Sequence, residues 1–489
     1  MNAPVATTPA FRDNARRALQ DDGLQKVLAT MRGGFSAKRA EAAAALPEFE
    51  ALRDSARDIK NHTLAHLDIY LEQFEAQVKA AGGHVHYARD AAEARRIVAG
   101  ICRDLGAKTV TKGKSMISEE IGLNAHLEAE GFTPVETDLG EYIIQLRGET
   151  PSHIIAPAFH LSAAQVEQDF RRAHTQLPPE RDLSDPVNLL NEARQVLRQR
   201  FLTADVGVTG ANFLIAETGA SVIVTNEGNG DLTQTLAKAH VVLASIEKLA
   251  PTLEDCAQML RVLARSATGQ DSSVYVTFSA GARRDGDPDG PGEYHVVLLD
   301  NGRSAMLGTS FQEMLRCIRC GACMNHCPVY QAVGGHAYGW IYPGPMGAVL
   351  TPSLIGVEKG GQLPNASTFC GRCEAVCPVR IPLPKLMRHW REREFERRLA
   401  PATVRSGLAF WGFFARRPWL YRQATRAGAA LMALAARGRG RFRRLPFATG
   451  WTDSRDFPAP EGETFQAMWA RRQARRAAAG AGDRREGGQ

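Results

Sequence analysis

The chain has 489 residues, 44% of them hydrophobic, which is enough for two to four domains with sizeable cores. It contains no run of about 18 to 20 apolar residues, and its first ten residues lack the pattern of a signal peptide, which excludes a membrane-spanning helix and favours a cytoplasmic protein. The formal net charge is +7, and the basic surplus lies in residues 401–489, which hold 17 Arg, no Lys and 6 acidic residues.

The N-terminal region, residues 1–67, is predicted to be helical. From Leu52 to Ala81 apolar residues recur mostly every three or four positions, which is typical of a helix with one buried face, and a pair of glycines is expected to end it. His62 and His66 lie one turn apart on this helix, as metal ligands would, but two histidines are too few ligands for a metal site.

Over residues 68–302 short apolar runs alternate with helical patterns, which predicts one α/β domain with a largely parallel sheet. The expected strands are His84–Ala88, Thr109–Thr111, Thr133–Glu136, Tyr142–Leu146, His153–Pro157, Val206–Val208, Phe213–Ala216, Val222–Asn226, Val241–Ser245, Val274–Ser279 and His295–Leu299. The expected helices are Ala91–Leu105, Ser118–Glu130, Pro186–Arg200, Leu232–Ala239 and Leu253–Ser266.

Two polar segments of this domain are candidate ligand sites. The segment Thr111–Ser115 contains Lys112 and Lys114 ahead of a helix, where lysines and backbone N–H groups favour an anion; a solvated turn is the alternative. In Thr209–Gly219, glycines near Asn212 and Glu217 would let the backbone approach a small ligand, although tight turns between strands would have the same composition. Neither segment has the spacing of a P-loop or of a Rossmann fingerprint.

Seven of the nine cysteines lie in two runs within residues 303–400, the first spaced C-x2-C-x2-C-x3-C-P and the second C-x2-C-x3-C-P. This spacing is typical of bacterial ferredoxins, in which the first three cysteines of a run hold one [4Fe-4S] cluster and the fourth reaches across to the other. We therefore predict a ferredoxin-type domain with two [4Fe-4S] clusters. Cluster 1 would be held by Cys317, Cys320, Cys323 and Cys377, and cluster 2 by Cys327, Cys370 and Cys373.

Cluster 2 is one cysteine short, because Ser367 stands where a full second run would have its first ligand. The open iron could take the Ser367 oxygen, water or a partner's group, or could be lost to leave a three-iron cluster. Structural zinc and a disulfide framework are the other uses of such cysteines. Zinc sites usually combine two separated pairs, and disulfides are not expected in a chain without an export signal.

The loop between the cysteine runs, Gly334–Pro345, is rich in aromatic residues and turn formers, and it could shield the clusters from water or simply pack. Beyond the second run, Ile381–Arg398 is predicted to be helical. Two aromatic segments, Leu408–Phe414 and Pro418–Tyr421, stand among arginines, which favours contact with a membrane surface, a partner protein or the protein's own core. Residues 453–489 are expected to be largely disordered.

The arrangement of motifs resembles the lactate utilisation protein B family over roughly residues 15–400. The likeness rests on Thr111–Ile121, on Glu136–Leu146, on the run that starts at Cys317, and on Gly334–Gly339, in this order. It implies that residues 68–302 are a LUD domain with a fold related to the NagB/RpiA/CoA-transferase group. It also implies two [4Fe-4S] clusters held by seven cysteines, and a system that oxidises L-lactate to pyruvate.

The function we expect is therefore that of an iron-sulfur electron-transfer subunit rather than a stand-alone enzyme. The resemblance implies two partners, an iron-sulfur protein rich in cysteine motifs and a smaller LUD protein, and we expect the quinone pool as acceptor and no nucleic acid. Two alternatives remain. The LUD domain could itself be the 2-hydroxy-acid oxidising site, binding lactate through Lys112, Lys114 or Asn212, or the chain could be a non-redox metabolite-binding scaffold.

Overall fold

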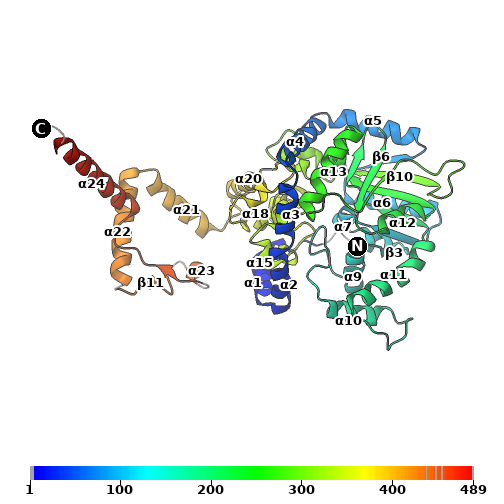
Figure 1. The fold of residues 1–489 in the computed structure, drawn as a ribbon, viewed down its shortest axis with the longest axis horizontal. Helices are drawn as coiled ribbons and strands as arrows, with labels where there is room; N and C mark the ends of the chain where they lie inside the picture. The colour runs from blue at the N-terminus through cyan, green and yellow to red at the C-terminus, as the bar shows by residue number, and fades with distance from the viewer. Residues whose placement is uncertain (1–4, 437, 446–448, 453–454, 487–489) are drawn as a thin grey trace. The chain divides into compact units, whose positions relative to one another are not determined.

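The computed structural model describes residues 5–436, 438–445, 449–452 and 455–486 (Figure 1). The chain divides into two compact units, Met1–Glu396 and Arg397–Gln489. The first unit contains both the α/β part and the cysteine runs, so the N-terminal helices, the sheet and the cysteine loops share one folded body.

The α/β part is built on a six-stranded sheet with the order β1-β10-β7-β4-β2-β3, in which every neighbouring pair is parallel. Its strands are β1 (His84–Ala88), β2 (Thr109–Gly113), β3 (Thr133–Glu136), β4 (Val206–Thr209), β7 (Ala239–Ser245) and β10 (Glu293–Leu299). The central strands are buried on both faces, which is why they are near-continuous apolar runs. The predicted parallel sheet is confirmed.

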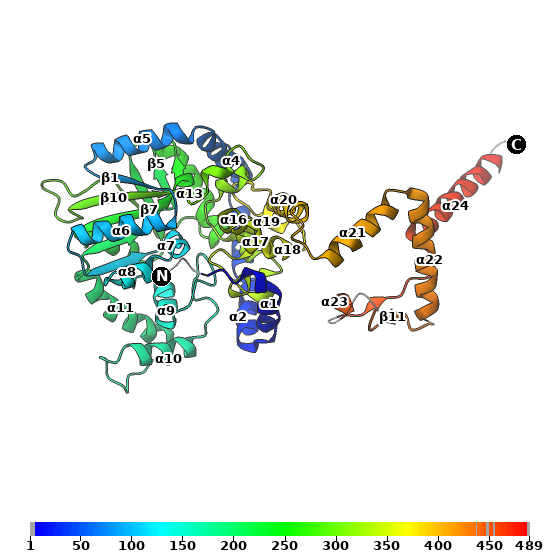
Figure 2. The ribbon, with the colours of Figure 1, turned by 180° about the vertical axis from the view of Figure 1, so that it is seen from behind.

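Helices and a smaller sheet cover the two faces. One face packs on α6 (Ala91–Asp104), α7 (Met116–Ile121) and α8 (Leu123–Ala129), and α6 runs beside β1 and β10 (Figure 2). The other face packs on α5 (Leu67–Ala80) and on part of a sheet ordered β8-β5-β6-β9. The strands of this sheet are β5 (Phe213–Ile215), β6 (Ala220–Thr225), β8 (Leu249–Ala250) and β9 (Tyr275–Ser279).

Two of the predicted strands are wrong. Tyr142–Leu146 lies inside helix α9 (Leu139–Arg147), which Asp138 caps by accepting hydrogen bonds from two backbone N–H groups. The apolar residues of α9 pack against α10 (Ala163–Ala173) and α11 (Pro186–Leu202). The run is too short for the spacing of its apolar residues to distinguish a helix from a strand. His153–Pro157 is an irregular segment, apolar because it is largely buried beside the cysteine runs.

Two predicted helices are interrupted. The helix expected over residues 52–81 is two helices, α4 (Phe49–Ala65) and α5, separated by His66 with φ −128°. The helix expected over residues 118–130 is divided into α7 and α8 by Gly122, which has φ +65° and so takes a left-handed conformation that suits glycine. Two further helices are α12 (Asn229–Thr235) and α13 (Leu253–Ala267), and α12 begins and ends earlier than predicted.

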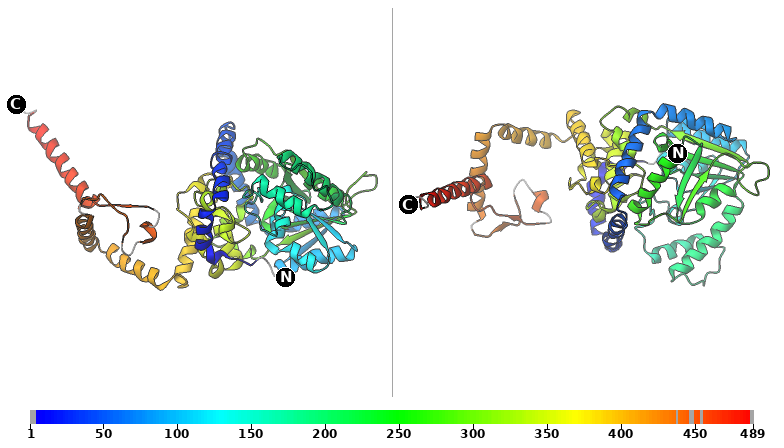
Figure 3. Two further views of the ribbon diagram at one scale, coloured as in Figure 1. Left: turned by 90° about the horizontal axis from the view of Figure 1, so that it is seen from below. Right: turned by 45° about the horizontal axis from the view of Figure 1, so that its top comes forward.

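Three N-terminal helices lie against the cysteine-rich segment, although that segment comes much later in the sequence (Figure 3). They are α1 (Phe11–Gln20), α2 (Asp22–Gly33) and α3 (Phe35–Ala44). Phe11 packs edge-on against Tyr338, and both belong to one core with the cysteines. The cysteine-rich segment itself is built of short helices. These are η4 (Gln312–Arg316), α14 (Ala322–Asn325), α15 (Tyr330–Val333), η5 (His336–Tyr338), α16 (Gly344–Ile355), α17 (Val357–Gly360), α18 (Gln362–Asn365), α19 (Arg372–Ala375) and α20 (Leu383–Glu396).

The second unit contains α21 (Ala402–Ala415), α22 (Pro418–Ala436), β11 (Arg441–Phe442), α23 (Thr449–Thr452), β12 (Phe457–Pro458) and α24 (Phe465–Glu486). Helix α24 occupies a segment that we expected to be disordered, because alanine and arginine favour helix even where no core forms. Positions 453–454 and 487–489 of that segment lie outside the described residues. In the part of the chain that the structure describes, no helix is both long and apolar enough to cross a membrane.

Candidate iron-sulfur site

The four cysteines of the predicted cluster 1 line one small cavity. Cys317, Cys320 and Cys323 reach it from the first cysteine run, and Cys377 reaches it from the second. The remaining walls are mostly apolar and include Met314, Ile318, Met346, Val379, Ile381 and Leu383. All nine cysteines are free thiols, which contradicts the alternative of a disulfide framework.

The two cysteine runs share a backbone turn that brings their sulfurs together. In the first run Arg319 and Gly321 have φ +61° and +74°, and in the second Phe369 and Gly371 have φ +53° and +79°. These left-handed residues flank Cys320 and Cys370, and each glycine leads into a one-turn helix. Such alternation of backbone conformation aims successive N–H groups at one point, which suits an anionic centre.

The three cysteines of the predicted cluster 2 are near one another but differ in exposure. Cys327 and Cys373 are buried, whereas Cys370 is exposed. Burial, then the nearby Cys327 thiol, raises the pKa of Cys373 to about 12. Ser367 is partly buried, and its hydroxyl accepts a hydrogen bond from the Phe369 N–H at 3.1 Å. The ligand sets of both clusters stay predictions.

The chemistry of these side chains suits a cationic metal centre. Burial raises the pKa of Cys320 to about 12, so this thiol would hold its proton unless a positive centre replaced it. The Ile381 N–H donates to the Cys377 sulfur at 3.4 Å, and the Tyr338 hydroxyl bonds the Cys327 sulfur. Donors to thiolate sulfur stabilise the charged form and tune the reduction potential of an iron-sulfur cluster.

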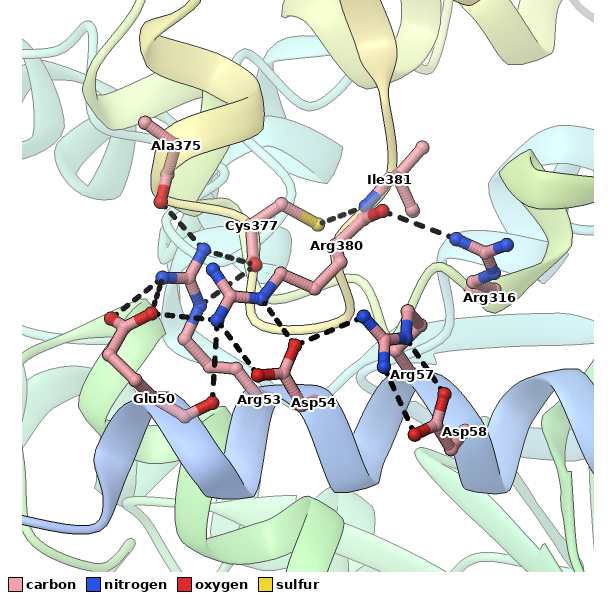
Figure 4. Close-up of polar contacts among 10 residues, drawn as sticks. All are labelled: Glu50, Arg53, Asp54, Arg57, Asp58, Arg316, Ala375, Cys377, Arg380 and Ile381. Carbon is pink, nitrogen blue, oxygen red and sulfur yellow. Dashed lines mark hydrogen bonds and ion pairs between the residues drawn. The ribbon is translucent and has the colours of Figure 1, made fainter.

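An arginine from the N-terminal region holds the second cysteine loop in place (Figure 4). Arg53, on α4, donates to the Cys377 carbonyl at 3.1 and 2.9 Å and to the Ala375 carbonyl at 2.6 Å. Its side chain is 4% exposed, and Glu50 pairs with it at 2.7 Å. The predicted helical region therefore positions a candidate cluster ligand, which its charge pattern alone did not indicate.

A second arginine fixes the turn that follows Cys377. Arg380 has φ +51°, and its guanidinium group bonds Glu50 and Asp54 of α4 at 2.8 and 3.1 Å. Its carbonyl accepts a hydrogen bond from Arg316, just before the first run, at 3.2 Å (Figure 4). These contacts tie both cysteine runs to the same helix.

A chain of buried charges connects the sheet to the first cysteine run. Arg303 is fully buried and pairs with Glu120 at 2.7 Å and with Glu247 at 3.1 Å. Glu247 also pairs with Arg319 at 3.3 Å, and the Arg319 guanidinium lies over the Tyr342 ring at 4.9 Å. Burial alone would raise the pKa of Glu247, but the charges of Arg303 and Arg319 outweigh burial and lower this pKa to about 2.

Basic residues outnumber carboxylates in this buried region. The basic residues are Lys60, Lys248, Arg303 and Arg319, and the carboxylates are Glu120 and Glu247. Burial and then the charge of Arg319 lower the pKa of Lys248 to about 7. A buried positive surplus is costly unless anions compensate it, and the thiolate-bound cluster that the cysteines are predicted to hold would be one such anion.

The lysines of the segment Thr111–Ser115 do not lie in a solvated turn. Lys112 belongs to β2, is 1% exposed and pairs with Glu119 at 2.9 Å and with Glu136 at 2.6 Å, so it is not free to bind a substrate anion. Lys114 follows the strand and pairs with Asp138 at 2.9 Å. The alternative of a simple solvated turn is wrong, because the lysines compensate buried carboxylates.

The second candidate segment is divided between a cavity and the surface. Asn212 lines a cavity with Lys114, Lys248, Arg319 and Cys320. Glu217 is exposed and only accepts a hydrogen bond from the Leu253 N–H at 3.0 Å, so it lies outside that cavity. Lys248 and Arg319 were not among the predicted ligand residues, because isolated basic residues carry no spacing signal.

The rings of the two histidines considered as metal ligands are tilted by 57° to each other, with centroids 4.8 Å apart, and His62 bonds the Tyr70 hydroxyl at 2.9 Å. Within the described residues no third metal-binding side chain completes a group with His62 and His66. Both lie at the break between α4 and α5, where His62 contacts Tyr70 of the next helix.

Three family models match this chain. A LUD domain model matches residues 71–299, a 4Fe-4S dicluster domain model matches residues 313–381, and a model described as lactate utilisation protein B, C-terminal, matches residues 373–474. The last match extends the likeness beyond residue 400, where we expected it to end.

Curated relatives match over nearly the whole length. Lactate utilization protein B of Macrococcus caseolyticus is 43% identical and covers 93% of this chain and 96% of the relative. Lactate utilization protein B of Geobacillus thermodenitrificans is 43% identical, with coverages of 95% and 97%. The protein of the same name from Oceanobacillus iheyensis is 41% identical, with coverages of 95% and 96%.

Proposed function

Because the chain belongs to the lactate utilization protein B family, we propose that it is the iron-sulfur electron-transfer subunit of a system that oxidises L-lactate to pyruvate. The observation that carries the proposal is the 4Fe-4S dicluster match over the two cysteine runs, four of whose thiols line one cavity. Oxidation of lactate releases two electrons, and two one-electron centres in series can accept and pass them on.

Cys317, Cys320, Cys323 and Cys377 would hold cluster 1, and Cys327, Cys370 and Cys373 would hold cluster 2. Iron-sulfur clusters supply reversible single-electron transfer. The protein's own contribution is electrostatic. Arg53 and Arg319 place positive charge near cluster 1, which favours its more negative, reduced form, while the apolar walls exclude water.

We propose that electrons leave or enter through cluster 2, since Cys370 is the exposed member of the set. The partners would be an iron-sulfur protein rich in cysteine motifs and a smaller LUD protein, and the final acceptor a quinone. A cytoplasmic location fits such a complex, with peripheral contact at the inner face of the membrane.

Helices α21 and α22 support the membrane contact. Phe410, Trp411 and Phe413 are 69%, 61% and 47% exposed, Trp419 is 65% exposed, and no residue of α21 is buried. Exposed aromatic residues among arginines suit an anionic interface. Co-sedimentation with anionic but not with neutral vesicles would support this contact, and equal sedimentation with both would count against it.

A second function has one observation in its favour. Lys114 and Asn212 share a cavity with Cys320, so the LUD domain could bind the 2-hydroxy acid beside cluster 1 and oxidise it there. The remaining alternative, a scaffold that binds a metabolite without redox chemistry, would leave the cysteine runs without a role.

The test is reduction of a dye by L-lactate, measured anaerobically with this protein alone and with its two proposed partners. We expect activity only when all three proteins are present, and loss of that activity in Cys320→Ala. Cys256→Ala, a buried cysteine outside both runs, is the matched control. Activity of this chain alone would favour the second function, and full activity of Cys320→Ala would contradict electron transfer through the clusters.

A further inference from the structure

A cavity of about 170 Å³ lies where the sheet faces the first cysteine run. Lys114, Asp138, Gly210 and Lys248 line it, and they follow the carboxyl ends of β2, β3, β4 and β7. Parallel sheets bind ligands at this edge, at the point where the strand order reverses. Here the chain passes from β2 to β3 on one side and from β4 to β7 on the other, so the order reverses between β2 and β4, and Lys114 and Gly210 just beyond these two strands line the cavity.

The far wall of the cavity belongs to the candidate iron site. Arg319, Cys320 and Tyr342 line it, so a bound molecule would lie against a ligand of cluster 1. A substituent at Gly210 would come within 2.7 Å of the Lys114 carbonyl, so the two strand ends approach closely at the cavity floor.

Lys248 lines the cavity without a partner of its own. The residue is only 6% exposed, and within the described part of the chain its ammonium group makes no hydrogen bond or ion pair. Burying such a charge is costly unless something compensates it. Arg319 adds a second cation, whose pairing with Glu247 at 3.3 Å is long for a charge-assisted contact.

The acids on the wall do not cancel these charges. Asp138 is paired with Lys114 at 2.9 Å. Glu141 is buried, and burial together with Glu136 and Asp138 raises its pKa well above the usual range, which favours its neutral form. Lys248 therefore faces the cavity with no carboxylate of the wall paired to it, beside Arg319, and an anion bound there would favour the charged form of Lys248.

An uncharged donor and an apolar side complete the cavity. Thr225 and Asn212 lie on the same wall, and among the described residues the hydroxyl of Thr225, which is 3% exposed, has no hydrogen-bond partner. Ile154, Ile155 and Leu263 form apolar parts of the lining. A carboxylate, a neighbouring oxygen and a small apolar group would together satisfy these surfaces.

We propose that this cavity binds a small monocarboxylate with an oxygen on the carbon next to the carboxylate, held by Lys248 and Arg319 against cluster 1. Ligand pockets for larger molecules usually hold roughly 300–1,000 Å³, so a cavity of about 170 Å³ suits a small acid better than a nucleotide or flavin. The choice of acid class rests on the proposed function, which supplies L-lactate and pyruvate as candidates. The existence of the cavity and of its unpartnered groups is independent of that proposed function.

The experiment is calorimetric titration of the anaerobically purified, full-length protein with L-lactate, pyruvate, propionate and lactamide. We expect one molecule of L-lactate or pyruvate per chain, weaker binding of propionate, which lacks the neighbouring oxygen, and none of lactamide, which lacks the carboxylate. Lys248→Met should weaken binding about tenfold or more, because a charge-assisted contact is lost. Lys108→Met, an exposed lysine of the same domain, should leave it unchanged.

Lys248→Met is expected to fold, because it removes an unpaired buried charge. Thr225→Val, which removes the unpartnered hydroxyl while keeping the shape of the side chain, is the second variant and should also weaken binding. The inference is overturned if neither acid binds to protein with its full iron content, or if both variants bind as the parent does. Iron counted in the same samples separates this outcome from failure of the proposed function, which would show as protein without iron.

Discussion

At the scale of single residues, the site depends on buried charges that come from outside the cysteine runs. Arg53 contacts two carbonyls of the loop that carries Cys377 and is almost fully buried, and Arg39 donates to a third, that of Val376, at 3.0 Å. Hydrogen bonds from a charged group contribute about 1.5–3 kcal/mol each, so one side chain can decide whether this loop is ordered.

We predict that Arg53→Met destabilises the protein by about 2–4 kcal/mol and lowers its iron content, because two carbonyls lose their charged donor and Glu50 keeps only Arg380 as a partner. Arg57→Met is the matched control on the same helix. Arg57 pairs with Asp54 and Asp58 at a partly exposed position, so losing these ion pairs is expected to lower the free energy of unfolding by less than about 1 kcal/mol. Denaturant unfolding and iron analysis of both variants measure this, and equal effects would remove the special role of Arg53.

At the scale of elements, the glycine-rich loop after the first cysteine run packs against the backbone of the α/β part. A methyl group on Gly335 would stand 1.7 Å from the Ser152 carbonyl oxygen. Tyr330, just before this loop, donates to the same carbonyl at 2.6 Å. The aromatic loop therefore serves as a contact between the two parts, in addition to covering the cysteines.

We expect Gly335→Ala to destabilise the protein by about 3 kcal/mol or more, because backbone must move to admit the methyl group. Gly100→Ala, inside α6 with no atom within 4 Å of the new methyl group, should instead stabilise by up to about 1 kcal/mol. Thermal unfolding of the two variants gives the comparison. A Gly335→Ala protein as stable as the parent would contradict the close approach.

A histidine in the sheet gives a pH dependence. His240, on β7, is 1% exposed and bonds the Thr209 hydroxyl at 2.7 Å, and burial lowers its pKa to about 3. In the unfolded chain it titrates near 6.5. Between these values the unfolded state binds the extra proton, so the stabilising effect is complete above pH 6.5 and is lost as the pH falls towards 3.

His240→Gln, which keeps a hydrogen-bonding group without titrating, should therefore reduce the loss of stability between about pH 7 and about pH 5 by about 2 kcal/mol. Urea unfolding at several pH values measures the slope. His66→Gln, at an exposed position, controls for the removal of a histidine. A slope unchanged by His240→Gln would mean that this residue is not the neutral group that we describe.

Much of the sheet could be predicted from the sequence, because buried parallel strands such as Val241–Ser245 are continuous apolar runs with clear ends. The run Tyr142–Leu146 was misassigned because an amphipathic helix of this length has the same composition. The cysteine runs were recognisable because spacing is a local property. Arg53, Lys248 and Arg319 were not, because their roles depend on contacts such as that between Arg53 and Cys377, which are far apart in the sequence.

At the scale of the whole molecule, the separation of residues 397–489 as a compact unit leads to a prediction. Truncation after Glu396 removes no cysteine and should leave the iron content unchanged. If the second unit docks partners or membrane, the truncated protein should lose lactate-dependent dye reduction in the three-protein assay. Iron and activity measured side by side decide this, and loss of iron would mean that the second unit supports the cluster domain.

The most direct test of the account is an iron and sulfide count on the anaerobically purified protein, followed by EPR during stepwise reduction. We predict about eight irons per chain for two complete clusters, or about seven if the Ser367 corner of cluster 2 is empty, and signals from two interacting centres. Cys373→Ala should remove the signal of one centre and keep the other. A protein without iron or sulfide, or one that holds a single zinc ion in their place, would contradict the account.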